Sequence, residues 1–167
     1  MRILGIDPGF ERLGIAVLEK DKNGKKPFDK TQGKEKVLFS ECFKTSAKLE
    51  FSERLFLIGE EIKSVIKKWK PGVLAIETLF LNTNQKTVMR VAEARGVVIY
   101  EASLSGLRIF EASPPEVKTA TTGYGKANKE QVMKMVKILT NIDSAKKSDD
   151  EMDAIAIALT ASAQIRE

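Results

Sequence analysis

The sequence predicts an α/β fold in which α-helices flank a five-stranded mixed β-sheet. Three short apolar stretches separated by polar or turn residues come first, which is typical of a meander of strands. Amphipathic patterns of helical period then alternate with two further short apolar runs. A meander followed by alternating helices and strands favours one mixed sheet covered by helices. The chain has no internal repeat, and we expect a single domain spanning residues 1–167.

The first part of the chain predicts three strands. Residues 2–7 and 13–18 are apolar and are joined by a Pro-Gly turn, and residues 37–45 predict the third strand. Residues 19–36 between them are polar, rich in lysine and interrupted by Gly and Pro. We therefore expect a flexible loop over 19–36.

The next segment predicts a helix and a buried strand. Over 51–69, apolar residues recur at alternating steps of four and three: Phe51, Leu55, Ile58, Ile62, Val65 and Trp69. Lysines 67, 68 and 70 are placed favourably near the C-terminal end of the helix dipole. Pro71-Gly72 ends the helix, and the strand over 73–76 stops at Glu77.

The remaining elements alternate in type. A helix is expected from about residue 84 to 103, with alanines and Gly96 that permit close packing against another helix. Residues 107–111 predict the fifth strand, and Ser113 with Glu116 forms a capping box with proline in the first turn. A helix bearing Val132, Met135, Val136 and Leu139 follows a loop with two glycines, and a second capping box opens the last helix, 149–165. The predicted order is β-β-β-α-β-α-β-α-α.

Composition excludes several kinds of chemistry. The chain has no histidine, which excludes Ser-His-Asp and Cys-His triads and histidine zinc sites. Cys42 is the only cysteine, so the chain contains no intrachain disulfide and no cysteine-rich metal cluster. No apolar run approaches the roughly 20 residues of a membrane helix, and no signal segment is present, so we expect a cytoplasmic protein with no membrane partner. The net charge of +5 is a mild indication of a polyanionic partner. The chemistry left for a hydrolase uses carboxylates.

Two carboxylates close buried strands, and two more lie on the last helix. Asp7 and Glu77 end apolar strands, although either alone is explained as well by a solvated strand end. Asp150 and Asp153 are one turn apart and are expected to project from the same face. Helix N-terminal acidity explains Asp149 and Asp150 well, and Asp149 competes with Asp150 for any role. It explains Asp153 less well, since an apolar helix follows.

If these carboxylates converge without Arg, Lys or His between them, they repel one another and their pKa values rise. A divalent cation relieves that repulsion, and hard oxygen ligands suit Mg²⁺ or Mn²⁺. Two such ions, about 3.5–4 Å apart, can clamp the attacking and leaving oxygens of a phosphodiester. This chemistry needs no histidine, but spacing alone does not establish it.

Four motifs in order resemble the RuvC-type crossover (Holliday) junction endodeoxyribonucleases of the RNase H-like superfamily. The similar segments are ILGIDPG with LGIAV (3–9, 13–17), AIETLF with ARGV (75–80, 94–97), SPPEVK with TGYGKANKEQV (113–118, 122–132), and Asp150-x-x-Asp153-AIAIALT. The resemblance runs along nearly the whole chain. It implies an RNase H-like fold and resolution of four-way DNA junctions in homologous recombination and DNA repair.

The resemblance also implies roles for individual residues. Asp7, Glu77, Asp150 and Asp153 would be catalytic and hold two Mg²⁺ ions, with Mn²⁺ as an alternative. A homodimer would place symmetric paired nicks, with a branch-migration complex of the RuvA and RuvB type as partner. The implied DNA contacts are Phe80, Lys118, Lys129, Gly123 and Gly125. Without the family, a core phenylalanine and solvated lysines explain Phe80, Lys118 and Lys129 better, and a flexible loop is the alternative for Gly123 and Gly125.

The chain departs from the family pattern at two places. The lysine-rich segment 19–36 is longer than the usual turn of the family. It is interpreted first as an insertion without a function, and alternatively as an additional contact to a junction arm. The last helix lacks the histidine that often follows its threonine. Three other functions stay open: a YqgF-like nuclease of the same fold acting on structured RNA, a junction-binding protein without cleavage, and an actin-like phosphate-binding domain suggested by GIDPG alone.

Overall fold

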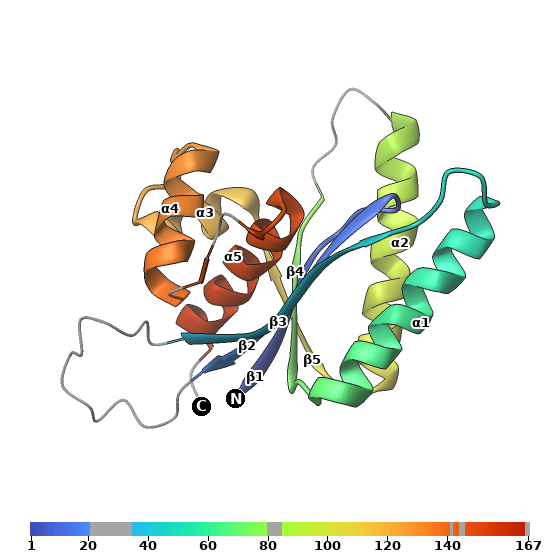
Figure 1. Ribbon diagram of the computed structural model, residues 1–167, viewed down its shortest axis with the longest axis horizontal. Coiled ribbons are helices and arrows are strands. Elements are labelled where there is room, and N and C mark those ends of the chain that lie inside the picture. The colour runs from blue at the N-terminus through green and yellow to red at the C-terminus, as the bar shows by residue number, and fades with distance from the viewer. Residues whose placement is uncertain (21–34, 80–84, 141, 144–145, 166–167) are drawn as a thin grey trace.

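The computed structural model describes residues 1–20, 35–79, 85–140, 142–143 and 146–165 (Figure 1). The strands are β1 (Arg2–Asp7), β2 (Arg12–Lys20), β3 (Glu35–Lys44), β4 (Val73–Glu77) and β5 (Arg108–Ala112). The helices are α1 (Phe51–Trp69), α2 (Gln85–Leu104), α3 (Pro114–Thr122), α4 (Lys129–Thr140) and α5 (Asp149–Gln164). Among these helices, none has the length and apolar character needed to cross a membrane.

The strands form one mixed sheet in the order β3-β2-β1-β4-β5. The first three strands pair antiparallel as a meander, whereas β1, β4 and β5 run parallel. Strand β1 is therefore central, with β2 on one side and β4 on the other. Because β1 and β4 are parallel and Ile6 pairs with Ile76, their carboxyl ends meet at the same edge of the sheet.

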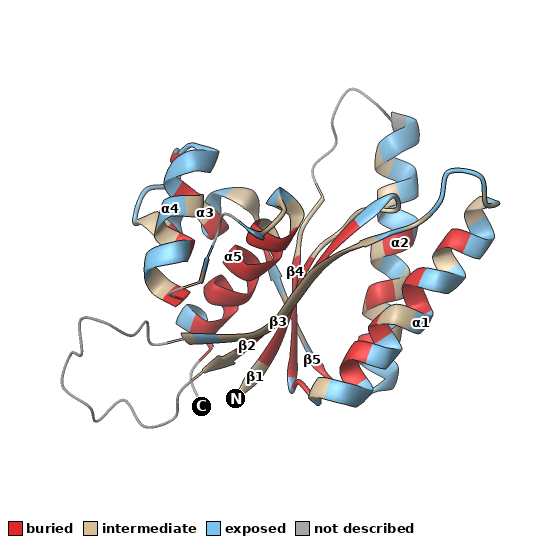
Figure 2. Cartoon of the chain, in the orientation of Figure 1, coloured by how far each residue is buried: buried red, intermediate tan, exposed pale blue. Residues whose placement is uncertain are grey.

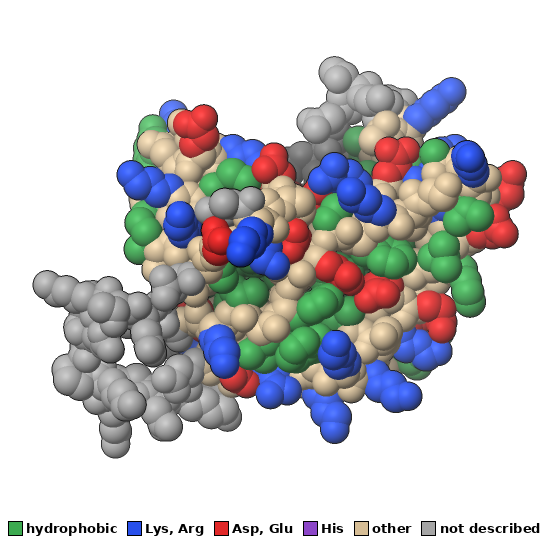
Figure 3. Space-filling model, viewed as in Figure 1, with side chains coloured by type: hydrophobic (Ala, Val, Ile, Leu, Met, Phe, Trp, Pro, Cys, Tyr) green, Lys and Arg blue, Asp and Glu red, His purple; other side chains and the backbone are tan. Residues whose placement is uncertain are grey.

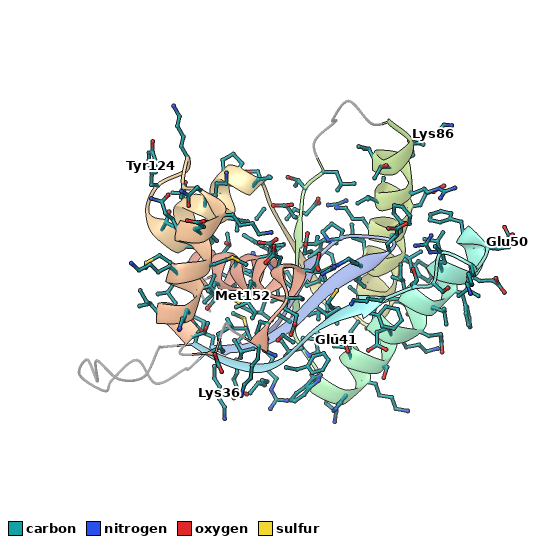
Figure 4. All side chains as sticks on the ribbon, turned by 45° about the horizontal axis from the view of Figure 1, so that its top comes forward. Lys36, Glu41, Glu50, Lys86, Tyr124 and Met152 are labelled. Atoms are coloured by element: carbon teal, nitrogen blue, oxygen red, sulfur yellow. The ribbon has the colours of Figure 1, made fainter. Side chains whose placement is uncertain are left out.

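Helices cover both faces of the sheet. Alternation along β1 sends Ile3 and Gly5 toward α5, whereas Leu4 and Ile6 face α1 and α2. Buried residues gather on both sides of the sheet and along α5 (Figure 2). Helix α5 is buried over most of its length, and its Met152, labelled in Figure 4, belongs to the buried core on this side of the sheet. This burial explains why its sequence is apolar all round.

The predicted fold class is confirmed, with one addition to the element order. The capping box at Ser113 opens a separate helix, α3, which the predicted order did not count; Gly123 ends it with a φ of 78°. Strands β2 and β3 also extend into the expected loop as far as Lys20 and Glu35. The rest of that loop, 21–34, lies outside the described residues. Helix α5 ends at Gln164, one residue before its predicted end.

Candidate active site

The carboxyl edge of the sheet brings three of the four predicted acidic residues together. Asp7 is the last residue of β1 and Glu77 the last of β4, on neighbouring parallel strands. The first turns of α5 lie over this edge and supply Asp153. All three side chains line one cleft of about 210 Å³. Its complete lining consists of Asp7, Glu77, Pro114, Val117, Lys118, Lys129, Val132, Asp153 and Ile157.

Two glycines let α5 approach the sheet closely enough to form this cleft. A Cβ at Gly5 would lie 2.8 Å from the Ala158 Cβ and would also meet the Ala154 carbonyl oxygen. A Cβ at Gly14 would overlap the Asp150 carbonyl oxygen and lie 3.1 Å from the Asp7 Cβ. Because backbone atoms obstruct both positions, any larger residue there would push α5 outward.

We therefore expect Gly14→Ala to destabilise the protein by about 1–3 kcal/mol, the usual cost of overpacking a tight interior. Chemical denaturation of the purified variant measures this free energy of unfolding. Gly72→Ala is the matched control, because a Cβ at Gly72 meets nothing within 4 Å. Equal stability of both variants would show that α5 does not depend on contact at Gly14.

Burial and mutual repulsion raise the pKa values of the three clustered carboxylates. Burial raises the pKa of Asp7 to about 7, with further contributions from the charges of Asp153, Glu77 and Asp150. Burial also raises the pKa of Glu77, again helped by Asp153. The pKa of Asp153 is raised mainly by burial, against the opposing hydrogen bond from Lys129. The surroundings of the cleft therefore do not fully stabilise the negative charge of these three ionised carboxylates.

The carboxylate of Asp150 pairs with an arginine that was not predicted from the sequence. Its Oδ2 accepts a hydrogen bond from Arg12 Nε at 2.8 Å, contacts Arg12 Nη2, and lies 3.4 Å from Cys42 Sγ. Burial alone would raise the pKa of Asp150, but these hydrogen bonds bring it below its ordinary value. Asp150 and Asp153 lie one turn apart at the start of α5, and the charge of Asp150 raises the pKa of both Asp7 and Asp153. Asp150 nevertheless pairs with Arg12 of β2 and is not among the residues that line the cleft. As they stand, no three acidic side chains in the described part of the chain are arranged to hold one metal ion.

Cations are interleaved with the carboxylates, contrary to the assumption made from the sequence. Lys129 Nζ lies 3.0 Å from Asp153 Oδ2 and 3.3 Å from Asp149 Oδ2. Lys118 lines the cleft, and its positive charge offsets part of the rise in the pKa of Glu77. Acidic and basic side chains lie close together over α4 and α5 in Figure 3. These lysines partly neutralise the cluster, and they also provide positive charge beside it for an anionic substrate.

The other predicted contacts lie around the α3–α4 loop or outside the described residues. Gly123 adopts the left-handed conformation that ends α3. A Cβ at Gly125 would come 2.9 Å from Thr119 Oγ1, so the Thr119 side chain would have to shift to accept one. Between them, Tyr124 is 59% exposed at the tip of the loop (Figure 4). Phe80 falls within residues 80–84, outside the described residues.

Two arginines near the site were not predicted from the sequence. Arg95 on α2 donates from Nε to the Glu77 carbonyl oxygen at 3.0 Å and pairs with Glu111, which ties α2 to the ends of β4 and β5. Arg12 pairs with Asp150. A signal for Arg12 was present, since a turn that joins two antiparallel strands returns the chain to the edge where Asp7 lies.

The strand order and the carboxylates at one sheet edge define this chain as a protein with an RNase H-like fold. The family model described as crossover junction endodeoxyribonuclease RuvC matches residues 3–161. The chain is 40% identical to the crossover junction endodeoxyribonuclease RuvC of Caldanaerobacter subterraneus over 159 residues, 95% of this chain and 90% of that protein. The chain belongs to the RuvC family of crossover junction endodeoxyribonucleases.

Solved structures agree with this assignment. The Thermus thermophilus RuvC structure superposes with a TM-score of 0.85 at 30% identity, covering 98% of this chain and 94% of that one. The same TM-score and identity hold for T. thermophilus RuvC in complex with a Holliday junction substrate, over 97% and 93% of the two chains. The predicted family and fold are thereby confirmed.

Proposed function

We propose that this protein is a metal-dependent endonuclease that resolves four-way DNA junctions by paired, symmetric nicks during homologous recombination and DNA repair. The observation that carries the proposal is the convergence of Asp7, Glu77 and Asp153 on one cleft with Lys118 and Lys129 beside them. This site is found in a chain 40% identical to named junction endonucleases. The fold alone would not select this activity.

The donor set fits a hard divalent cation. Asp7, Glu77 and Asp153 offer carboxylate oxygens, and each has a raised pKa because burial leaves its charge poorly stabilised. We assign these three residues and Asp150 as the groups that hold two Mg²⁺ ions, or Mn²⁺ in their place. Bound at this site, the ions would activate water and stabilise the oxygen that leaves the phosphodiester.

The residues around the cleft would position the DNA. Lys118 and Lys129 present positive charge to the phosphate backbone, and Gly123 and Gly125 allow backbone amides near a phosphate. We assign Phe80 to stacking against the bases near the cut, where base–aromatic stacking contributes about 1–3 kcal/mol. Arg95 keeps the Glu77 end of β4 in place through the Glu77 carbonyl oxygen.

The exposed surface of α2 supports a homodimer. Met89, Tyr100 and Leu104 are 63%, 63% and 70% exposed, and a Cβ at Gly96 would meet nothing within 4 Å. Spacings of seven, four and four place these four positions on one face of the helix. Gly96 is therefore not used for packing within the described part of the chain, and we assign this face to a second copy. Two copies would supply the two nicks, and a RuvA- and RuvB-type branch-migration complex would deliver the junction.

Junction binding should be strongly salt-dependent, with log K falling by ~0.9 for each phosphate neutralised on a duplex arm. We expect Lys118→Gln to weaken binding and to reduce the slope against log salt by about one. Fluorescence anisotropy with a labelled junction at several salt concentrations measures both. Lys63→Gln is the control, because Lys63 is exposed on α1 and pairs with Glu60. An unchanged slope for Lys118→Gln would remove this lysine from the DNA contacts.

The test of the proposed function is incubation of a labelled four-way junction with Mg²⁺ or Mn²⁺ beside a matched duplex, a single strand and a structured RNA. Symmetric, ligatable nicks in the junction alone would support the proposal. Selective cutting of the RNA would favour a YqgF-like activity. Tight junction binding without cutting in either metal would identify a binding protein instead.

A further inference from the structure

Two nitrogens of the Arg12 guanidinium contact the same oxygen of the Asp150 carboxylate. The Arg12 guanidinium contributes Nε, at 2.8 Å, and Nη2, and Cys42 Sγ lies 3.4 Å from the same oxygen. Three donor groups on β2 and β3 therefore converge on Asp150 Oδ2. With these contacts, Asp150 is not among the residues that line the cleft with Asp7, Glu77 and Asp153.

The backbone at Asp150 has little freedom to compensate. Its carbonyl oxygen packs against Gly14 so closely that a Cβ there would overlap it. The N-terminus of α5 is also secured by the capping box between Ser148 and Glu151. The direction of the Asp150 carboxylate thus depends mainly on its side-chain torsions, and Arg12 is the strongest partner that acts on them.

We propose that Arg12 is a positioning residue that competes with the divalent cation for the Asp150 carboxylate. This inference rests on the proposed function, because it assumes that Asp150 takes part in holding the metal. The Arg12 side chain is 52% exposed, so it can turn into solvent without burying an unpaired charge. Metal binding to the free protein then includes the cost of breaking the pair between Arg12 and Asp150.

The test is a Mn²⁺ titration of DNA-free protein, with free Mn²⁺ measured by electron paramagnetic resonance. We expect Arg12→Ala to bind Mn²⁺ about two- to fivefold more tightly than wild type, the range that a partly exposed ion pair supports. Arg2→Ala is the matched control, because Arg2 on β1 forms a similar exposed pair with Glu19. Arg2→Ala should leave the affinity unchanged.

A double-mutant cycle separates competition for Asp150 from simple repulsion between Arg12 and the cation. If Arg12 acts through Asp150, the effect of Arg12→Ala disappears in an Asp150→Asn background. The same tightening in both backgrounds would overturn the inference, as would unchanged or weaker binding by Arg12→Ala alone. The variant Asp7→Asn distinguishes failure of the Arg12 inference from failure of the proposed metal site. Unchanged Mn²⁺ binding by Asp7→Asn means that the proposed metal site is wrong. Lost Mn²⁺ binding by Asp7→Asn supports the metal site, whatever the result for Arg12.

Discussion

Asp7→Asn is expected to abolish junction cleavage while leaving junction binding nearly intact. Asp7 is central among the clustered carboxylates, and its pKa responds to Asp153, Glu77 and Asp150 together. Loss of a residue that only hydrogen-bonds to a metal ligand costs about 10–100-fold, so replacing Asp7, a proposed ligand, should cost more than about 100-fold. Lys118 and Lys129, which we assign to DNA binding, are unchanged in this variant. Single-turnover cleavage and anisotropy with the same labelled junction measure the two effects.

The same substitution should stabilise the metal-free protein. Because burial raises the folded-state pKa of Asp7 to about 7, the folded protein keeps a proton that the unfolded chain loses near pH 4. Stability of the wild type therefore falls as pH rises from about 4 to 7, and the loss is complete above pH 7. Asn carries no charge, so we expect Asp7→Asn to gain on the order of 2–4 kcal/mol at pH 8 and little at pH 4.

Denaturation in the presence of a chelator at both pH values checks this gain. A variant that loses cleavage and gains stability at pH 8 cannot owe its inactivity to misfolding. Cleavage at near wild-type rate would show that the two-metal assignment is wrong. Equal stability of wild type and Asp7→Asn at both pH values would show that Asp7 is better solvated than its position implies.

Much of this fold follows from local sequence signals. Short apolar runs predict all five strands, and the capping box at Ser148 gives the start of α5 to the residue. The capping box at Ser113 marks the start of α3, although the predicted order did not count that helix. Asp7 and Glu77 could each be predicted to close a buried strand, and the family resemblance implied that they act together; the parallel pairing of β1 and β4 supplies the physical reason, since it brings both strand ends to one edge. Asp153 could be added because an isolated carboxylate rarely precedes so apolar a helix.

The remaining features depend on contacts between residues far apart in sequence. Arg12 and Asp150 are 138 positions apart, and Lys129 reaches Asp153 from a different helix. Helical spacing predicts that Asp150 and Asp153 share a face, but it contains no information about the arginine that pairs with Asp150. The sequence likewise shows that Gly96 permits close packing, but it does not show that no neighbour within this chain packs against it in the described residues.

The second large effect is expected from Tyr100→Glu, which should convert the proposed dimer into monomers. Tyr100 lies on the exposed face of α2 with Gly96, Met89 and Leu104, and tyrosines are common energetic centres of interfaces. Removing such a residue typically costs about 2 kcal/mol or more, which is about 30-fold in the dimer dissociation constant. A buried unpaired carboxylate at the interface would add to this cost. Analytical ultracentrifugation across a concentration series measures the shift.

Ile138→Glu is the control for an added surface charge, because Ile138 is 58% exposed on α4. It should leave the association state unchanged. If the dimer places the two nicks, Tyr100→Glu should reduce paired cleavage far more than single nicking, since each copy keeps Asp7, Glu77 and Asp153. A Tyr100→Glu protein that sediments as the wild type does would move the interface to another surface. Tyr100 and the carboxylate cluster lie on different elements. Loss of paired cleavage with single nicking retained would therefore assign the pairing of nicks to the α2 surface and phosphodiester cleavage to the carboxylates at the sheet edge.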